Sequence, residues 1–240
     1  MNSISIILFG YNESDSIKAV FLSIWKIIPK IANEYEIIII DDGSTDNSKE
    51  IIDMITSEYK FVSSIFNKEN LGIGKTLLKG YNSAKKENLC CIPLDGQFDP
   101  IELLKIKNKK IKSNNFVSFY RVNNTEYTFF RIMLSKLNFL LNFFILGISL
   151  KDVNWVKIYK RNHLKNIKIS LTSSLIETEI CSKLIINNIK PIELESKYLK
   201  RNYGISKIKS YKILLNVFYE IPLLIINIIG FRIKNLSTRK

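Results

Sequence analysis

Short apolar runs alternate with amphipathic segments along the first hundred residues of the chain. Four such runs end in turn-forming residues, at 4–9, 36–40, 62–66 and 89–94. These runs are typical of buried strands, and the segments between them have helical spacing. Asp99 and Pro100 then predict the start of a further helix, with Asp99 as its cap. Alternating strands and helices predict an α/β fold, in which helices flank a mainly parallel sheet.

After residue 113 the pattern is less regular. The predicted segments are, in order, a strand at 116–120, a helix with a broad apolar surface at 129–148, an extended segment at 152–159, a helix at 174–186, a short strand at 192–194 and a basic loop at 197–209. No repeat, linker or second core separates them. One domain over residues 1–210 is therefore predicted, followed by a tail at 211–240.

The tail is apolar but contains polar interruptions and Pro222. It is short of the run of about 20 apolar residues that a membrane-spanning helix needs. The tail and the segment at 129–148 predict apolar helices flanked by Lys and Arg, which are typical of helices that lie on a membrane surface. The alternative is that these helices pack on the sheet or form a seam between subunits, so an oligomer is possible.

The chain is strongly basic, because 36 Lys and Arg stand against 22 Asp and Glu in 240 residues, a net charge of +14. Nucleic acid, an anionic membrane surface or a phosphorylated substrate would each fit this charge. We expect no nucleic-acid partner, since no zinc, helix-turn-helix or ribonucleoprotein motif accompanies the charge. The lysine run at 105–112 is interpreted as a solvated helix face.

The cysteines and the first residues bear on the compartment. Cys90, Cys91 and Cys181 have no metal-binding spacing and fit a reducing compartment. The first residues predict a strand and a polar loop, not a signal peptide. We therefore expect the protein on the cytoplasmic side. The single histidine, His163, has no obvious partner and is expected to be structural.

Two adjacent carboxylates follow the apolar run at 36–40. Asp41 and Asp42 open a turn that continues with Gly43 and Ser44. The carboxyl ends of strands in open α/β sheets are where ligands bind. Buried carboxylates need a partner, such as a metal, a sugar hydroxyl or a base edge. The alternative is that both carboxylates only cap the turn.

Four further motifs occur in the same order as in a known family. They are Tyr11-Asn12-Glu13, Asn70-Leu71-Gly72-Ile73-Gly74, Leu94-Asp95-Gly96-Gln97-Phe98-Asp99-Pro100 and Arg201-Asn202-Tyr203-Gly204-Ile205-Ser206-Lys207. Together with the paired carboxylates they resemble family 2 glycosyltransferases of the Rossmann-like GT-A fold. The resemblance is strongest to the branch of dolichyl-phosphate mannose synthases and polyprenyl-phosphate glycosyltransferases, and it covers residues 4–209.

The resemblance implies an inverting transfer of sugar from a UDP- or GDP-linked donor, with residues 1–113 as the nucleotide-sugar half. The nucleotide-binding residues that it implies are Phe9, Tyr11, Glu13, Asp41, Asp42, Gly72 and Gly74. Asp95 and Gln97 would hold Mg²⁺ or Mn²⁺ on the diphosphate. Pro93 stands where the family has the first Asp of its D-x-D segment. Arg201 and Lys207, in the basic loop, would stabilise the departing charge.

Residues 114–210 would form the acceptor half, and the implied acceptor is polyprenyl phosphate at the cytoplasmic membrane face. Arg121, Arg131 and Ser135 would bind its phosphate, next to an apolar helix that meets the lipid. Asp152 is a further catalytic candidate, and Trp155 stands where the family has Gly.

Three interpretations of the reaction stay open. A lipid phosphate is already anionic and needs no strong base. A saccharide acceptor, as in cell-surface polysaccharide synthesis, needs a general base, for which Asp152 or Glu179 is the candidate. A non-catalytic relative that only binds nucleotide is the third interpretation, and it is favoured by Pro93 and Trp155.

Overall fold

The structure is a computed structural model and describes residues 1–122, 143, 147–200 and 211–237. Most of the predicted helix at 129–148 and of the basic loop at 197–209 lies outside the described residues. Four candidate site residues lie outside them too: Arg131, Ser135, Arg201 and Lys207.

The described part of the chain forms strands and helices with the following bounds. The strands are β1 (Ser3–Gly10), β2 (Glu34–Asp41), β3 (Val62–Phe66), β4 (Asn88–Pro93), β5 (Asn115–Val122), β6 (Lys157–Lys160) and β7 (Lys190–Lys197). The helices are α1 (Ser14–Ile27), α2 (Ser48–Glu58), α3 (Ile73–Ser83), α5 (Arg161–Lys165), α6 (Ile176–Ile186) and α7 (Tyr211–Ser237), with 3₁₀ helices η1 (Ile28–Lys30) and η2 (Pro100–Asn108). The first four predicted strands are all present.

The strands form one sheet in the order β3-β2-β1-β4-β6-β5-β7. β1 runs parallel to β2 and β4, β2 to β3, and β5 to β7, whereas β6 is antiparallel to both of its neighbours. The prediction of a mainly parallel sheet is confirmed. Gly10 pairs with Asp41 and Phe9 with Pro93, so the carboxyl ends of β1, β2 and β4 meet at one edge.

Two predicted boundaries in the second half are wrong. Of the extended segment at 152–159, only the last residues form strand β6, and a turn precedes it. The short strand predicted at 192–194 is the middle of the eight-residue strand β7. Glu193 and Glu195 alternate with inward apolar residues there, because one face of this edge strand is solvated.

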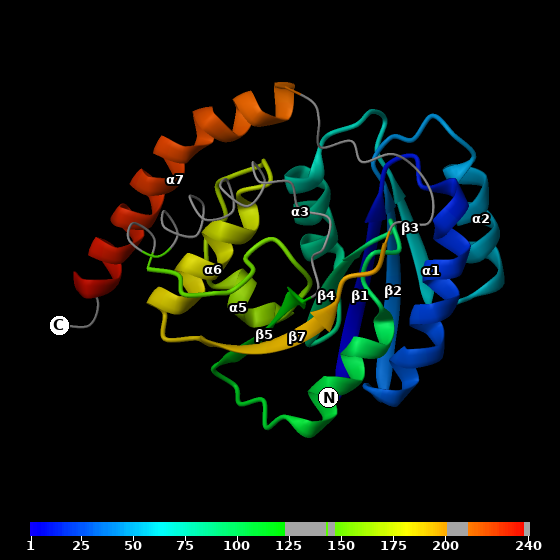
Figure 1. The fold of residues 1–240 in the computed structure, drawn as a ribbon, viewed down its shortest axis with the longest axis horizontal. Coiled ribbons are helices and arrows are strands. Elements are labelled where there is room, and N and C mark those ends of the chain that lie inside the picture. Colours follow the sequence, from blue (N-terminus) through cyan, green and yellow to red (C-terminus); the bar gives the residue numbers. More distant parts are fainter. Residues whose placement is uncertain (123–142, 144–146, 201–210, 238–240) are drawn as a thin grey trace.

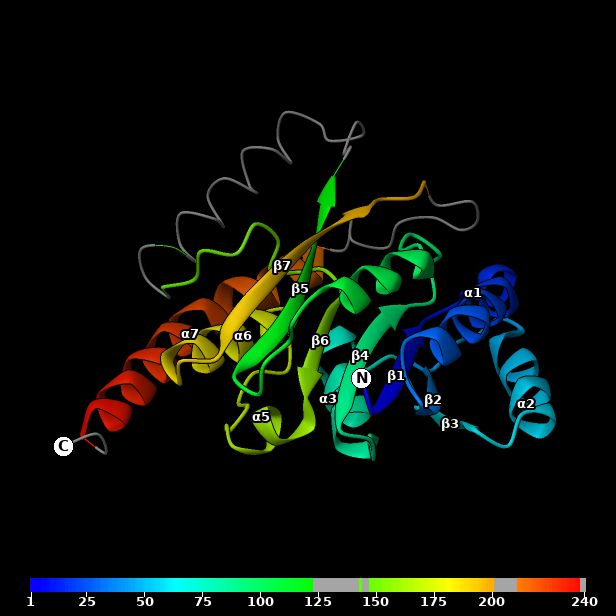
Figure 2. The same ribbon diagram turned by 90° about the horizontal axis from the view of Figure 1, so that it is seen from below.

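Each face of the sheet packs against its own hydrophobic core. Ile6 and Leu8 of β1 face the core that contains α1, α2 and η2, whereas Ile7 faces the core that contains α3 and α6. Successive side chains of a strand point to opposite faces. A strand that is buried on both faces must therefore be mainly apolar, which explains the unbroken Ile run of β2. Figures 1 and 2 show α1 and α2 on one side of the sheet and α6 and α7 on the other.

The tail forms one continuous helix, α7, which passes through Pro222. Pro222 therefore does not end this helix. Leu224 and Ile228 are buried in the same core as α6, and this packing stabilises the helix beyond the proline. The opposite side of α7 exposes six large apolar side chains: Tyr219, Leu223, Ile226, Ile229, Ile233 and Leu236. Among the described residues, no helix is both long enough and apolar enough to cross a membrane.

The two sides of α7 predict that Leu→Ala has a large effect on stability at one position and a small effect at the adjacent position. Leu224 is 0% exposed and Leu223 is 48% exposed. Leu224→Ala should lower the free energy of unfolding by about 2–5 kcal/mol, because it leaves a cavity against α6. Leu223→Ala should change it by about 0.5 kcal/mol or less. Urea unfolding of both variants measures this, and equal effects would contradict the packing of α7 on the core.

Candidate active site

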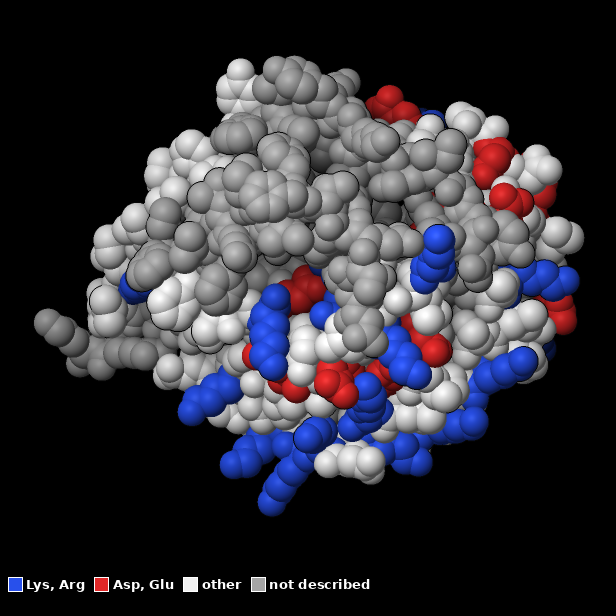
Figure 3. Space-filling model, viewed as in Figure 1, with Lys and Arg blue, Asp and Glu red and all other residues white. Residues whose placement is uncertain are grey.

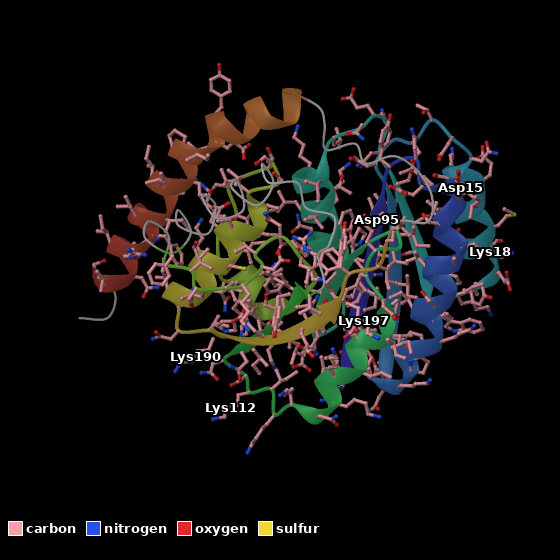
Figure 4. The ribbon with its side chains drawn as sticks, viewed as in Figure 1. Asp15, Lys18, Asp95, Lys112, Lys190 and Lys197 are labelled. Atoms are coloured by element: carbon pink, nitrogen blue, oxygen red, sulfur yellow. The ribbon has the colours of Figure 1, made fainter. Side chains whose placement is uncertain are left out.

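The loops that follow β1, β2 and β4 are tied to one another at the sheet edge. The Asp42 amide donates to the Gly10 carbonyl at 2.9 Å, and the Leu94 amide donates to the Phe9 carbonyl at 2.9 Å. Asp95 thus lies at the end of the sheet that also carries Tyr11 and the paired carboxylates (Figure 4). Three of the sequence motifs are brought together here, as the sheet topology requires.

Asp42 holds the donor-side loop in shape. Its carboxylate accepts hydrogen bonds from Asn67 Nδ2 at 2.7 Å and from the backbone amides of Leu71 and Gly72, each at 3.0 Å. The side chain is buried, and these donors supply the partners that a buried carboxylate needs. Asp42 therefore fixes the loop at 67–72 relative to β2.

Asp41 shapes its own turn. Its carboxylate accepts from the backbone amide of Ser44 at 3.1 Å and from the Ser44 hydroxyl. In the structure both carboxylates thus cap loops, as the alternative interpretation of the sequence holds. Their proposed contacts with a nucleotide stay predictions.

The loop after β1 is anchored to the loop after β2. The Asn12 amide donates to Ser44 Oγ at 2.8 Å, and the Thr45 amide donates to Asn12 Oδ1 at 2.7 Å. Asn12 has a φ of 53°, a left-handed conformation that Asn tolerates better than most residues. These bonds place the half-buried Tyr11 and Glu13 on either side of Asn12, at the edge of the sheet.

Gly74, in the glycine motif at 70–74, allows two backbone segments to pack closely. A Cβ atom at Gly74 would collide with the carbonyl oxygens of Thr172 and Ser173. Only glycine lets the first turn of α3 lie against that segment. Gly74 therefore joins the donor side of the molecule to the segment that precedes α6. The amide of Gly72, two residues earlier, is one of those that Asp42 holds.

The segment at 95–99 forms a tight turn that leads into η2. Gly96 has a φ of +73°, and the Gln97 amide donates to Asp95 Oδ1 at 3.1 Å. Asp99 caps η2 by accepting from the Ile101 amide at 3.1 Å, so its predicted role as a cap is confirmed. Gln97 Nε2 donates to the Tyr198 phenol oxygen at 2.5 Å.

The oxygen donors of this turn fit a divalent ion that the substrate helps to hold. Mg²⁺ in phosphate sites takes one or two carboxylates and completes its shell with phosphate and water. Asp95 supplies one carboxylate and Gln97 one amide oxygen. Within the described residues, no group of three or more His, Cys, Asp or Glu could hold a metal. One carboxylate and one amide oxygen suit an ion that also takes oxygens from a diphosphate.

The acceptor-side candidates Arg121 and Asp152 are paired with each other. Arg121 Nε lies 2.7 Å from Asp152 Oδ2, and Arg121 Nη2 lies 3.1 Å from Asp152 Oδ1. The guanidinium also stacks 4.8 Å from the centroid of the Trp155 ring. The Trp155 indole in turn donates to Ser196 Oγ at 2.8 Å. Trp155, which replaces the family's Gly, thus holds Arg121 between an aromatic face and a carboxylate.

Glu179 has no place in the chemistry of this site. It is 0% exposed, and its carboxylate accepts from the amides of Ser170 and Leu171 and lies 2.5 Å from Lys183 Nζ. This carboxylate anchors the loop before α6, so the structure contradicts its proposed role as a general base.

A second buried network lies beneath the turn at 152–155 and was not predicted from the sequence. Lys157 is buried, and its ammonium donates to the Trp155 carbonyl at 3.0 Å and lies 3.4 Å from Glu177. Glu177 also accepts hydrogen bonds from the phenols of Tyr81 and Tyr159. Burial raises the pKa of both phenols well above the usual value, so they stay donors at neutral pH. The network ties the turn to α6 and α3.

One group of basic residues lies away from the carboxyl edge of the sheet. Figure 3 shows Lys and Arg side chains gathered over the region of β5, β7 and η2. Lys112, which precedes β5, and Lys190, at the start of β7, lie well away from Asp95 (Figure 4). His163 Nε2 makes a hydrogen bond of 2.8 Å with the Ser113 carbonyl, which fits the structural role expected of it.

A sequence model of a known protein family matches most of the chain. The model described as glycosyl transferase family 2 matches residues 5–168. The chain belongs to this family. It is therefore a glycosyltransferase, and the resemblance drawn from its motifs is confirmed.

Relatives and solved structures carry more specific names. The undecaprenyl-phosphate 4-deoxy-4-formamido-L-arabinose transferase of Proteus mirabilis is 24% identical over 238 residues, which are 96% of this glycosyltransferase and 72% of that protein. The protein of the same name from Pectobacterium atrosepticum is 23% identical over 240 residues, with the same coverage.

Two solved structures share the fold. Glucosyl-3-phosphoglycerate synthase from Mycobacterium tuberculosis, with Mn²⁺, UDP-glucose and phosphoglyceric acid, has a TM-score of 0.61, 17% identity and coverage of 91% of this chain and 79% of that one. A mannosyltransferase from Pyrobaculum calidifontis, with GDP-mannose and Mn²⁺, has a TM-score of 0.62, 12% identity and coverage of 95% and 73%. These likenesses confirm a GT-A-like α/β fold.

The three hydrogen bonds to Asp42 predict a local and a global effect of its removal. Asp42→Ala leaves the amides of Leu71 and Gly72 without their acceptor, and it should lower the free energy of unfolding by about 1–3 kcal/mol. Hydrogen exchange at these two amides should accelerate more than exchange in the β1 ladder. Asp53→Ala, which changes an exposed carboxylate of α2, is the matched control and should be near neutral. Unchanged exchange at 71–72 would contradict the anchoring role.

Proposed function

We propose that this glycosyltransferase transfers a sugar, with inversion, from a UDP- or GDP-linked donor to the phosphate of a polyprenyl lipid at the cytoplasmic face of the membrane. The observation that carries the proposal is the meeting of the Tyr11 loop, the paired carboxylates and the turn at 95–97 at one edge of the sheet. The named activities of the relatives support the lipid phosphate as acceptor.

On the donor side, we propose that Phe9, Tyr11 and Glu13 contact the base. An aromatic face and a carboxylate acceptor suit a nucleobase, and the anchored Asn12 fixes the backbone between these two residues. Asp41 and the loop that Asp42 holds through Gly72 would then border the ribose and diphosphate.

Asp95 and Gln97 would hold Mg²⁺ or Mn²⁺ against the diphosphate. When bound, such an ion neutralises the charge that develops on the leaving diphosphate. Through this ion, Asp95 and Gln97 would hold and orient the donor diphosphate at the edge of the sheet. Arg201 and Lys207 would further stabilise the departing charge from the basic loop.

On the acceptor side, the charges favour an anionic nucleophile. Asp152 is engaged by Arg121 on both of its oxygens, and Glu179 is buried and engaged by three donors. Neither candidate base is poised to take a proton from a sugar hydroxyl. An acceptor phosphate needs no such base, because its oxygen is already ionised. That oxygen would attack the anomeric carbon while the bond from this carbon to the diphosphate oxygen breaks. Arg121 would bind the acceptor phosphate, together with Arg131 and Ser135.

Substitution of Asp95 tests this function. Asp95→Ala should reduce transfer at least about a hundredfold, because stabilisation of the leaving group by a metal is worth several kcal/mol. The assay incubates purified protein, Mn²⁺ and undecaprenyl phosphate with a panel of labelled nucleotide sugars and measures label extracted into organic solvent. Asp99→Ala, which removes only the helix cap in the same segment, should retain transfer.

Three results of this assay would decide between the interpretations. Label in the organic phase with wild-type protein supports the lipid acceptor and identifies the donor. Label that stays in water, although nucleotide binds, supports a saccharide acceptor or a non-catalytic relative. Normal transfer by a folded Asp95→Ala variant contradicts the assignment of the metal site.

We further propose that the exposed side of α7 rests on the membrane surface. Its apolar stripe includes Ile226 and Ile233, and Arg232 and Lys234 are exposed beside it. Neighbouring residues of a helix project about 100° apart, so these two cations flank the stripe on either side. An apolar stripe between cations suits the surface of an anionic bilayer. The acceptor lipid would then enter the active site from the surface to which the enzyme is bound.

Charge on this stripe should weaken membrane binding. Burial of an Ile side chain contributes about 1.5–3 kcal/mol, so Ile226→Asp should reduce binding to phosphatidylglycerol vesicles about tenfold or more. Met54→Asp makes a comparable change at an exposed apolar residue of α2, on the other side of the sheet, and is the control. Cosedimentation with vesicles measures both. Equal binding of the two variants would contradict the role of α7.

A further inference from the structure

One side-chain hydrogen bond joins the turn at 95–97 to the residue that follows β7. Gln97 Nε2 donates to the phenol oxygen of Tyr198 at 2.5 Å. The two backbones are already connected, because Phe98 and Tyr198 form an antiparallel bridge and the Leu199 amide donates to the Gln97 carbonyl at 2.9 Å. The side-chain bond is therefore not needed to hold the two segments together. It acts on the carboxamide of Gln97.

The orientation of this carboxamide determines whether its oxygen or its N–H group faces a cation at the turn. An amide group carries one acceptor oxygen and one donor nitrogen. With its nitrogen directed to Tyr198, Gln97 offers its oxygen to a cation at the turn. The reverse orientation would direct an N–H group at the cation and repel it. Asp95 starts from the same turn, and its Oδ1 accepts the Gln97 amide.

The phenol of Tyr198 is itself held in place by aromatic and cationic contacts. Its ring centroid lies 5.6 Å from that of Trp155, and the guanidinium carbon of Arg121 lies 5.7 Å from it. Trp155 is fixed in turn by its hydrogen bond to Ser196, which is fully buried. The phenol oxygen is therefore a positioned acceptor for the Gln97 nitrogen.

We infer that Tyr198 is a positioning residue for the donor diphosphate. Its phenol oxygen orients the Gln97 carboxamide so that the carboxamide oxygen faces a divalent cation bound at Asp95. The inference rests on the proposed function, because it needs a metal at the turn at 95–97. It adds a residue from the acceptor half to the donor site.

Calorimetry of nucleotide binding tests this role without an activity readout. UDP and GDP are titrated, with and without Mn²⁺, into wild type, Tyr198→Phe, Gln97→Ala and the double variant. Tyr198→Phe keeps the ring against Trp155 and removes only the phenol oxygen. The gain in affinity that Mn²⁺ confers should fall about three- to tenfold, as for loss of one hydrogen bond. Affinity without metal should not change. In the Gln97→Ala background, Tyr198→Phe should cause no further loss, because it acts through Gln97.

The test has a matched control, and four results would contradict the inference. Tyr219→Phe makes the same chemical change on the exposed side of α7 and should have no effect. An unchanged gain from Mn²⁺ in Tyr198→Phe, or additive losses in the double variant, would overturn the inference. Equal losses with and without metal would assign Tyr198 a general structural role and would also overturn it. If wild type binds nucleotide but gains nothing from Mn²⁺, the proposed metal site fails together with the inference.

Discussion

The parallel register of β1 with β2 and β4 is the constraint on which the site depends. Since Gly10 pairs with Asp41 and Phe9 with Pro93, the loops after three strands leave the sheet at one edge. Buried side chains on both faces hold this register, because a slip of one residue would turn every side chain toward the opposite core. The two cores thus determine where the loops after β1, β2 and β4 meet.

At this edge, carboxylates of the same type have different roles because their surroundings differ. Asp42 is buried and receives three donors from the loop at 67–72, so it shapes that loop. Asp95 follows a strand end in a turn made possible by the positive φ of Gly96, one residue before Gln97. Burial and the donors from the loop at 67–72, more than its place in a motif, mark Asp42 as a loop anchor.

The sequence predicted the first half of the fold well, because strong local signals act there. Apolar runs, glycines and the Asp99 cap act on nearby residues. The first four strands, their order along the chain and the cap at Asp99 are therefore as expected. The second half depends on partners distant in sequence. No local pattern shows that Arg121 pairs with Asp152, or that the buried Lys157 meets Glu177. The continuity of α7 through Pro222 likewise comes from tertiary packing on α6, which overrides the local signal of proline. The family resemblance identified the motifs but could not tell which carboxylates the protein itself satisfies.

The two departures from the family pattern are both accommodated where they occur. Pro93 lacks an amide proton, but it ends β4, and the ladder to Phe9 continues through the Leu94 amide. Trp155 fills the space that a glycine would leave with an indole bonded to Ser196 and stacked on Arg121. Neither residue is strained or unsatisfied, so neither is by itself a sign of a decayed site. In the proposed metal site, Pro93 leaves one carboxylate fewer than the D-x-D segment that the resemblance implies, so the orientation of the Gln97 carboxamide would matter more.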